Sequence, residues 1–97
     1  MIRQIRGKVL SVEPTGAVID VAGFGIFVHL SDPEKLSAGQ EALVLTHMAV
    51  KQDGIELYGF TEYADLGFFE RVLSVSGVGP KTALSILRRG SREAIEN

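Results

Sequence analysis

Five short runs of strand-forming residues, separated by turn signals, fill the first sixty positions and limit the possible folds most strongly. They span residues 2–12, 17–21, 26–30, 41–50 and 55–60. Asp53-Gly54, between the last two runs, is a strong hairpin signal. Five antiparallel strands close most simply into a small barrel, and closure removes exposed strand edges. Glycines expected to relieve crowding where such strands bend are Gly7, Gly23, Gly25 and Gly59.

Composition changes at Thr61, where apolar residues begin to recur at helical spacing. We predict helices on either side of residues 76–81, and a short helical turn over residues 31–36. Gly90 predicts the end of the second helix, and residues 91–95 begin a third. The expected fold class is therefore β barrel plus α, with an OB-fold barrel over residues 1–61 and a helical domain over residues 62–97.

The segment between the two helices reads Ser-Gly-Val-Gly-Pro-Lys. A tight turn there leaves backbone N–H groups free at the start of the second helix, where anions are attracted. This is the pattern of a helix-hairpin-helix, a motif that contacts DNA phosphates and not bases. Glycine turns between helices are also common as purely structural features, and that alternative stays open. The candidate DNA-binding residues are Ser76, Gly77, Val78, Gly79, Lys81 and Thr82.

The charge balance argues against DNA binding through bulk positive charge. The formal net charge is −2, of which residues 1–61 carry all and residues 62–97 carry none. DNA binding would therefore depend on where the charges lie, or on several copies acting together. The chain has no cysteine, no apolar run of membrane-spanning length and no signal-peptide pattern, which favours a cytoplasmic protein.

Gln52 and Asp53 form the expected tip of the last hairpin. The structural alternative is that a type I′ turn requires Asp-Gly at this point. With Glu56 nearby, the tip would be mildly acidic, and an acidic hairpin beside a phosphate site would repel or separate strands.

Other residues carry weaker functional signals. His29 and His47 are expected in the core or partly buried, because no ligand set surrounds them. Aromatic residues fit barrel packing better than a base-stacking platform; they are Phe24, Phe27, Tyr58 and Phe60. The positive cluster Arg88, Arg89 and Arg92 fits either a solvated helix end or a second phosphate contact. No nucleophile–base pair, nucleotide loop or metal cluster is present, so we expect no enzyme activity, cofactor or metal.

The order of motifs resembles the N-terminal part of the RuvA family, bacterial subunits that bind Holliday junctions. The resemblance rests on residues 1–7, 21–29, 39–42, 45–47, 57–60 and 73–87. It implies a homotetramer, or an octamer, that holds a four-way DNA junction open. It also implies a RuvB-type ATPase partner that drives branch migration, with no chemistry by the subunit itself.

By position, the resemblance assigns Gly77, Gly79 and Lys81 to the first helix-hairpin-helix and Gln52 and Asp53 to the acidic pin. The family pin commonly carries two acids, and here Gln52 replaces one. Family members continue with a second hairpin and a RuvB-contacting domain, so we expect a fragment with weaker junction binding and no stimulation of RuvB. The alternatives are a general duplex or single-strand DNA-binding module, a helix-hairpin-helix glycosylase, which would need more helices, and an oligomeric scaffold without a DNA role.

Overall fold

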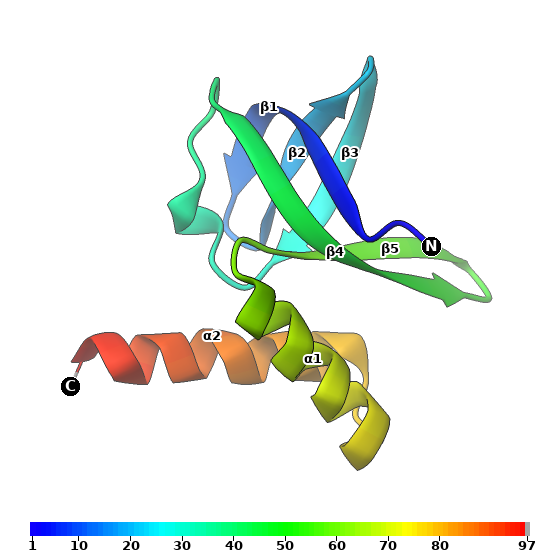
Figure 1. The fold of residues 1–97 in the computed structure, drawn as a ribbon, viewed down its shortest axis with the longest axis vertical. Coiled ribbons are helices and arrows are strands. Elements are labelled where there is room, and N and C mark those ends of the chain that lie inside the picture. Colours follow the sequence, from blue (N-terminus) through cyan, green and yellow to red (C-terminus); the bar gives the residue numbers. More distant parts are fainter. Residues whose placement is uncertain (97) are drawn as a thin grey trace.

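A computed structural model describes residues 1–96 of the chain, with the side chains of Ser76 and of residues 91–96 outside the description. Five strands form a closed barrel, and two helices lie against one end of it (Figure 1). The strands are β1 Gln4–Glu13, β2 Gly16–Val21, β3 Phe24–Leu30, β4 Glu41–Lys51 and β5 Gly54–Phe60. A 3-10 turn, η1 Pro33–Lys35, joins β3 to β4, and the helices are α1 Tyr63–Ser76 and α2 Pro80–Glu96. The expected five-stranded barrel followed by helices is confirmed.

One strand pairing differs from the expectation of an all-antiparallel barrel. Four neighbouring pairs are antiparallel, but β3 and β5 are parallel, with His29 opposite Tyr58 and Leu30 opposite Gly59. The reason is the order of the strands around the barrel, β1-β2-β3-β5-β4. β3 runs in the same direction as β1, because both are antiparallel to β2. β5 also runs in the direction of β1, because both are antiparallel to β4, so β3 and β5 are parallel where they meet.

The barrel interior follows from the alternation of side chains along the strands. In β1, Ile5, Gly7 and Val9 point inward and the residues between them are exposed. A Cβ on Gly7 would collide with the carbonyl oxygen of Asp20 on β2, and one on Gly59 would collide with two core valines. Both glycines therefore allow close packing, as predicted. The prediction is wrong for Gly23, which is a turn residue, and for Gly25, where a Cβ has room.

A second apolar cluster joins the barrel to the helices. It contains Tyr58, Phe60, Leu66, Phe69, Ala83 and Leu84, each nearly or fully buried. The ring of Phe69 lies 5.6 Å from that of Tyr58 and 4.9 Å from that of Phe60. Core packing is thus confirmed for Tyr58 and Phe60, whereas Phe24 is 72% exposed at the end of the β2–β3 hairpin.

The two tight hairpins have different turn chemistry. Ala22 and Gly23 link β2 to β3 with φ of 53° and 92°, which is the pattern of a type I′ turn. In the β4–β5 hairpin Lys51 pairs with Gly54, so Gln52 and Asp53 are the loop residues, and neither has positive φ. The type I′ turn expected at Asp53-Gly54 is therefore wrong. Gly54 lies one position beyond the loop, at the first residue of β5.

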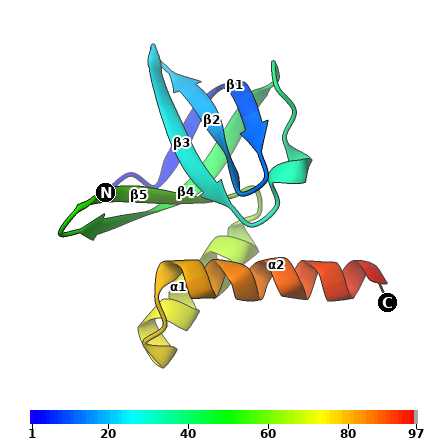
Figure 2. The ribbon, with the colours of Figure 1, turned by 180° about the vertical axis from the view of Figure 1, so that it is seen from behind.

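The helical region contains a longer second helix than expected. α2 continues through Gly90 to Glu96 as one rod beneath the barrel (Figure 2). Gly90 does not adopt the left-handed conformation with which glycine ends a helix. The predicted stop and third helix are thus wrong. No helix within residues 1–96 is long and apolar enough to cross a membrane.

Candidate nucleic-acid interface

The turn between α1 and α2 is built by two glycines with different tasks. Gly77 adopts the left-handed conformation, with φ 71° and ψ 9°, and ends α1. Val78 is half-buried and packs against the apolar cluster that joins the helices to the barrel. The carbonyl of Gly79 accepts a hydrogen bond from the N–H of Ala83, 3.1 Å away, which starts α2. The side of the turn that faces the apolar cluster is therefore fixed by Val78.

This geometry directs backbone donors toward solvent. Pro80 has no N–H, and the N–H groups of Lys81 and Thr82 precede the first intrahelical bond of α2. Both residues are exposed, and a Cβ built on Gly79 would meet no atom within 4 Å. A ligand can therefore approach the backbone closely at the positive end of the helix dipole. Ser76, the first of the predicted residues, is the last residue of α1.

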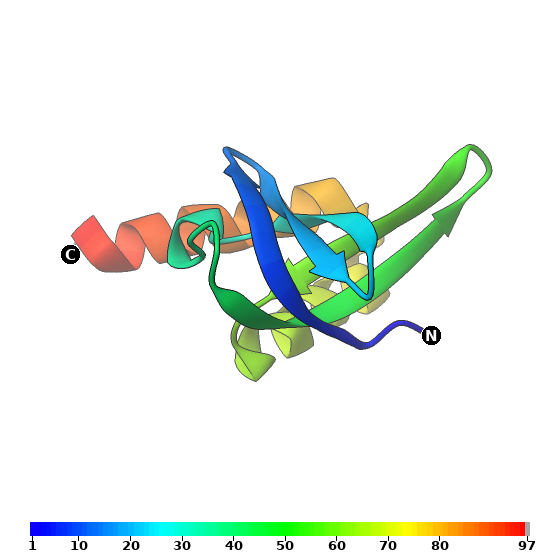
Figure 3. The same ribbon diagram turned by 90° about the horizontal axis from the view of Figure 1, so that it is seen from above.

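The tip of the β4–β5 hairpin is the second predicted site. Gln52 and Asp53 are both exposed, and the hairpin projects well beyond the barrel (Figure 3). Since the turn is not type I′, its backbone does not require an Asp-Gly pair at the central positions. The structural explanation for Asp53 is correspondingly weaker than the sequence indicated.

Glu56 does not extend the acidic tip, contrary to the sequence interpretation. Its carboxylate accepts a hydrogen bond from the Tyr58 hydroxyl at 2.7 Å and pairs with the Lys51 ammonium at 2.9 Å. These two partners, Tyr58 first, lower the pKa of Glu56 to about 2. Its other oxygen lies 3.9 Å from the Lys81 ammonium. Glu56 thus joins the hairpin to the start of α2.

The hairpin and α2 enclose a polar groove. Its volume is about 280 Å³, and it is lined by Lys51, Asp53, Gly54, Ile55, Glu56 and Lys81. The groove therefore brings the predicted pin residue Asp53 and the predicted phosphate contact Lys81 to one face of the molecule, although they are far apart in sequence.

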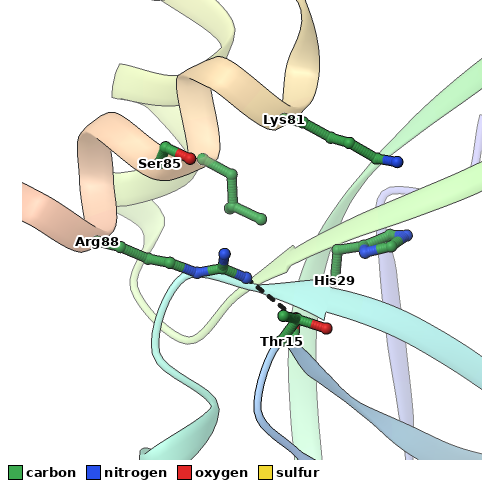
Figure 4. A pocket seen from close by; sticks show the side chains of 6 residues that line it. Thr15, His29, Lys81, Ser85 and Arg88 are labelled. Atoms are coloured by element: carbon green, nitrogen blue, oxygen red, sulfur yellow. Dashed lines mark hydrogen bonds between the residues drawn. The ribbon is translucent and has the colours of Figure 1, made fainter.

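A second cavity of about 260 Å³ lies between the barrel and α2. Figure 4 shows Arg88 reaching from α2 toward Thr15, with Lys81 and His29 also lining the cavity. The Arg88 guanidinium donates to the carbonyl of Leu30 at 2.7 and 3.1 Å and to that of Thr15 at 3.1 Å. Burial is the largest influence on His29 and lowers its pKa, so the ring adds no charge at neutral pH.

These contacts divide the positive cluster that the sequence left undecided. Arg88 uses its donors to hold α2 against the barrel, while Arg89 is exposed. The side chain of Arg92 lies outside the described residues. Sequence reasoning missed the docking role because both acceptors are backbone carbonyls more than fifty residues away, and no local pattern marks them. Both histidines are half-buried, as expected, and the described residues contain no group of three or more potential metal ligands.

Comparison with known families divides the chain into two matches. The RuvA N-terminal domain family matches residues 1–59, and a family described as a SAM-like helix-hairpin-helix tandem matches residues 69–97. The first match covers the barrel strands, and the second covers the turn between α1 and α2.

Three similar curated proteins are each named Holliday junction branch migration complex subunit RuvA. The protein from Thermus thermophilus is 46% identical over 89 residues, which are 90% of this chain and 47% of the relative. The protein from Lactococcus lactis subsp. lactis is 37% identical over 97 residues, covering 98% of this chain and 49% of the relative. The protein from Leifsonia xyli is 45% identical over 89 residues. The chain spans about half the length of the curated relatives it matches.

Proposed function

Because the chain belongs to the RuvA family, we propose that it binds four-way DNA junctions by their shape and backbone, without reading base sequence. The observation that carries the proposal is the open turn at Gly79, with the N–H groups of Lys81 and Thr82 and the Lys81 ammonium beside it. Donors of this kind bind phosphate oxygens, which every nucleotide presents alike. Ser76, Gly77 and Val78 shape the turn that presents them.

The β4–β5 hairpin gives the proposal its geometric component. We assign Gln52 and Asp53 to a pin at the centre of the junction, where the Asp53 carboxylate repels phosphates and keeps the strands apart. Gln52 contributes no charge, so this pin carries one acid per subunit. The proposed phosphate contact at Lys81 lies beside the pin, because Lys81 and Asp53 line the same groove.

Several copies of the chain are required for this function. One subunit with a net charge of −2 offers few phosphate contacts, whereas four copies would engage four arms at once and gain avidity. We therefore propose a homotetramer, or an octamer of two tetramers, in the cytoplasm. Residues 1–61 would carry assembly and the pin, and residues 62–97 the phosphate contact.

The subunit would hold the junction and perform no reaction of its own. The relatives' shared name places them in a branch migration complex. We propose that the complete protein works with a RuvB-type ATPase, which supplies the motor activity. The chain needs no cofactor for its part in this mechanism, because binding and shape selection use its own donors and charges.

A gel-shift comparison of a four-way junction with a linear duplex of equal length tests the proposal. The junction should bind more tightly than the duplex. Gly79→Val should abolish binding, because the valine side chain would fill the space through which a phosphate approaches the backbone. The barrel should stay folded, because a Cβ at this position meets no other atom within 4 Å. Lys81→Ala should weaken binding and flatten the slope of log affinity against log salt by roughly 0.9 for each phosphate that the variant no longer neutralises. Lys8→Ala, an exposed lysine on β1, is the matched control and should change little.

The same experiment separates the alternatives. Equal affinity for junction and linear duplex would indicate a general DNA-binding module. Normal binding by Gly79→Val would overturn the assignment of the turn. Absence of binding to either DNA would favour a scaffold without a DNA role.

A further inference from the structure

Glu56 is held in a fixed position at the base of the β4–β5 hairpin. Its oxygen Oε1 accepts from Tyr58 at 2.7 Å and faces Lys51 at 2.9 Å. Tyr58 is itself fully buried, and its ring stacks with that of His29 at 5.0 Å and with that of Phe69 at 5.6 Å. The hydrogen bond to Tyr58 therefore holds the carboxylate of Glu56 in one position against the buried core.

The second oxygen, Oε2, points away from these anchors. It lies 3.9 Å from the Lys81 ammonium and 3.8 Å from Nε2 of His29. Lys81 has a side chain that is 69% exposed, against 25% for Glu56. The lysine is thus the mobile partner of the pair, and the carboxylate stays in place when Lys81 turns toward another ligand.

The carboxylate of Glu56 is negatively charged at the neutral pH at which the protein would bind DNA. The pKa of Glu56 is lowered to about 2 by Tyr58 and Lys51, so the group is ionised at neutral pH. Lys51 balances part of that charge, but its ammonium lies against Oε1, while Oε2 faces Lys81. A phosphate that reaches Lys81 would therefore approach a fixed carboxylate as well as the lysine.

We propose that Glu56 restrains the affinity of the phosphate contact, by competing for Lys81 and by repelling the phosphate that would replace it. This role rests on the proposed function and adds a determinant on the pin hairpin, outside the helix-hairpin-helix itself. Its consequence is that a single contact stays weak, so stable binding depends on engaging several arms together. It also couples the two sites, because the residue that limits Lys81 belongs to the strand that forms the pin.

A double-mutant cycle tests this role in the 97-residue chain. Four proteins are compared for four-way junction binding: the unaltered chain, Glu56→Gln, Lys81→Gln and the double variant. Gln keeps an oxygen that can accept from Tyr58 but removes the charge. Glu56→Gln should tighten binding by about two- to fivefold, the range typical of exposed charge pairs. When Lys81 is already replaced by Gln, the substitution of Glu56 should increase junction affinity much less. With or without Lys81, the increase in affinity should become smaller as the salt concentration rises, because salt screens the charges.

Glu41→Gln is the control for net charge, because it removes the same charge from an exposed position at the opposite end of β4. Thermal unfolding of each variant checks that it is folded, and Glu56→Ala provides a second neutral side chain. A gain equal to that of Glu41→Gln, an equal gain in the presence and absence of Lys81, or weaker binding by both neutral variants would overturn the role of Glu56. If the unaltered chain does not bind the junction, the proposed function fails, and this role fails with it.

Discussion

At the scale of single residues, glycine has different roles at different positions of the chain. Gly7 lies where β1 passes β2, and its missing side chain leaves space for the carbonyl of Asp20. Gly67, within α1, has no positive φ, and no other atom lies within 4 Å of the position that a Cβ would take there. The same residue type is therefore required at one position and replaceable at the other.

Alanine substitutions should have opposite effects at these two positions. Gly7→Ala should lower the free energy of unfolding by about 1–3 kcal/mol, because β1 and β2 must separate to accept the methyl group. Gly67→Ala should raise it by about 0.5–1 kcal/mol, since alanine favours the helix. Urea unfolding midpoints of the two variants measure the difference. Equal midpoints, or a stabilised Gly7→Ala variant, would contradict the close approach of the two strands.

At the scale of elements, an ionic contact holds α1 against the barrel. The Glu70 carboxylate on α1 accepts hydrogen bonds from the Arg3 guanidinium at 2.6 and 3.2 Å and from the ring nitrogen Nδ1 of His47 at 2.8 Å. Arg3 precedes β1 and His47 belongs to β4, so the contact connects three segments distant in sequence. Hydrogen bonding from Arg3, and then from His47, lowers the pKa of Glu70 to about 2.

This contact predicts a defined pH dependence of stability. A carboxyl group whose folded pKa lies below its unfolded value stabilises the protein above the unfolded value and loses that contribution as pH falls through the folded one. For Glu70 the window runs from 4.5 down to about 2. Glu70→Gln should therefore be less stable than the unaltered chain at pH 7, and the difference should shrink across this window.

Urea midpoints measured between pH 7 and pH 2 give the difference directly. Comparison with the unaltered chain is needed because Glu56 loses its contribution over the same range. Glu13→Gln, at an exposed position of β1, is the control for the loss of one carboxylate. A difference between the Glu70 variant and the unaltered chain that is independent of pH would exclude an ionic role for Glu70.

Local patterns predicted most elements, but long-range contacts were beyond them. Strand-forming residues between turn signals identified the strands, and the helical spacing around Phe69 identified α1, because each of these signals is contained in neighbouring residues. The parallel pairing of β3 with β5 could not be predicted in this way, since it depends on the order of the strands around the barrel. The contacts of Glu56 and Arg88 were missed for a similar reason: their partners on other elements become neighbours only after folding. The position of the candidate phosphate turn was predictable because its signal is contained in a few adjacent residues.

At the scale of the whole molecule, the chain is a flat body that places its two candidate sites side by side. Its principal extents are 38, 37 and 20 Å. The β4–β5 hairpin and the start of α2 project on the same side (Figures 1 and 2). Exposed large apolar side chains on the barrel strands are Leu10, Val12, Phe24, Leu43, Val50 and Ile55. We expect burial of such side chains between barrels to drive assembly, because association of apolar surface is favourable in water.

Assembly should therefore control how well the chain distinguishes a junction from a linear duplex. We expect sedimentation velocity to detect a tetramer at tens of micromolar, a concentration at which an interface of about 6–7 kcal/mol begins to be populated. Junction binding should rise more steeply with protein concentration than duplex binding, because a tetramer can use four phosphate sites at once on a junction and fewer on a straight duplex. Titrating both DNAs across the range in which the oligomer forms measures this dependence, with Gly79→Val as the control that assembles but does not bind. A strictly monomeric chain that still prefers the junction would contradict the multivalent mechanism, because one copy presents only one such turn within residues 1–96.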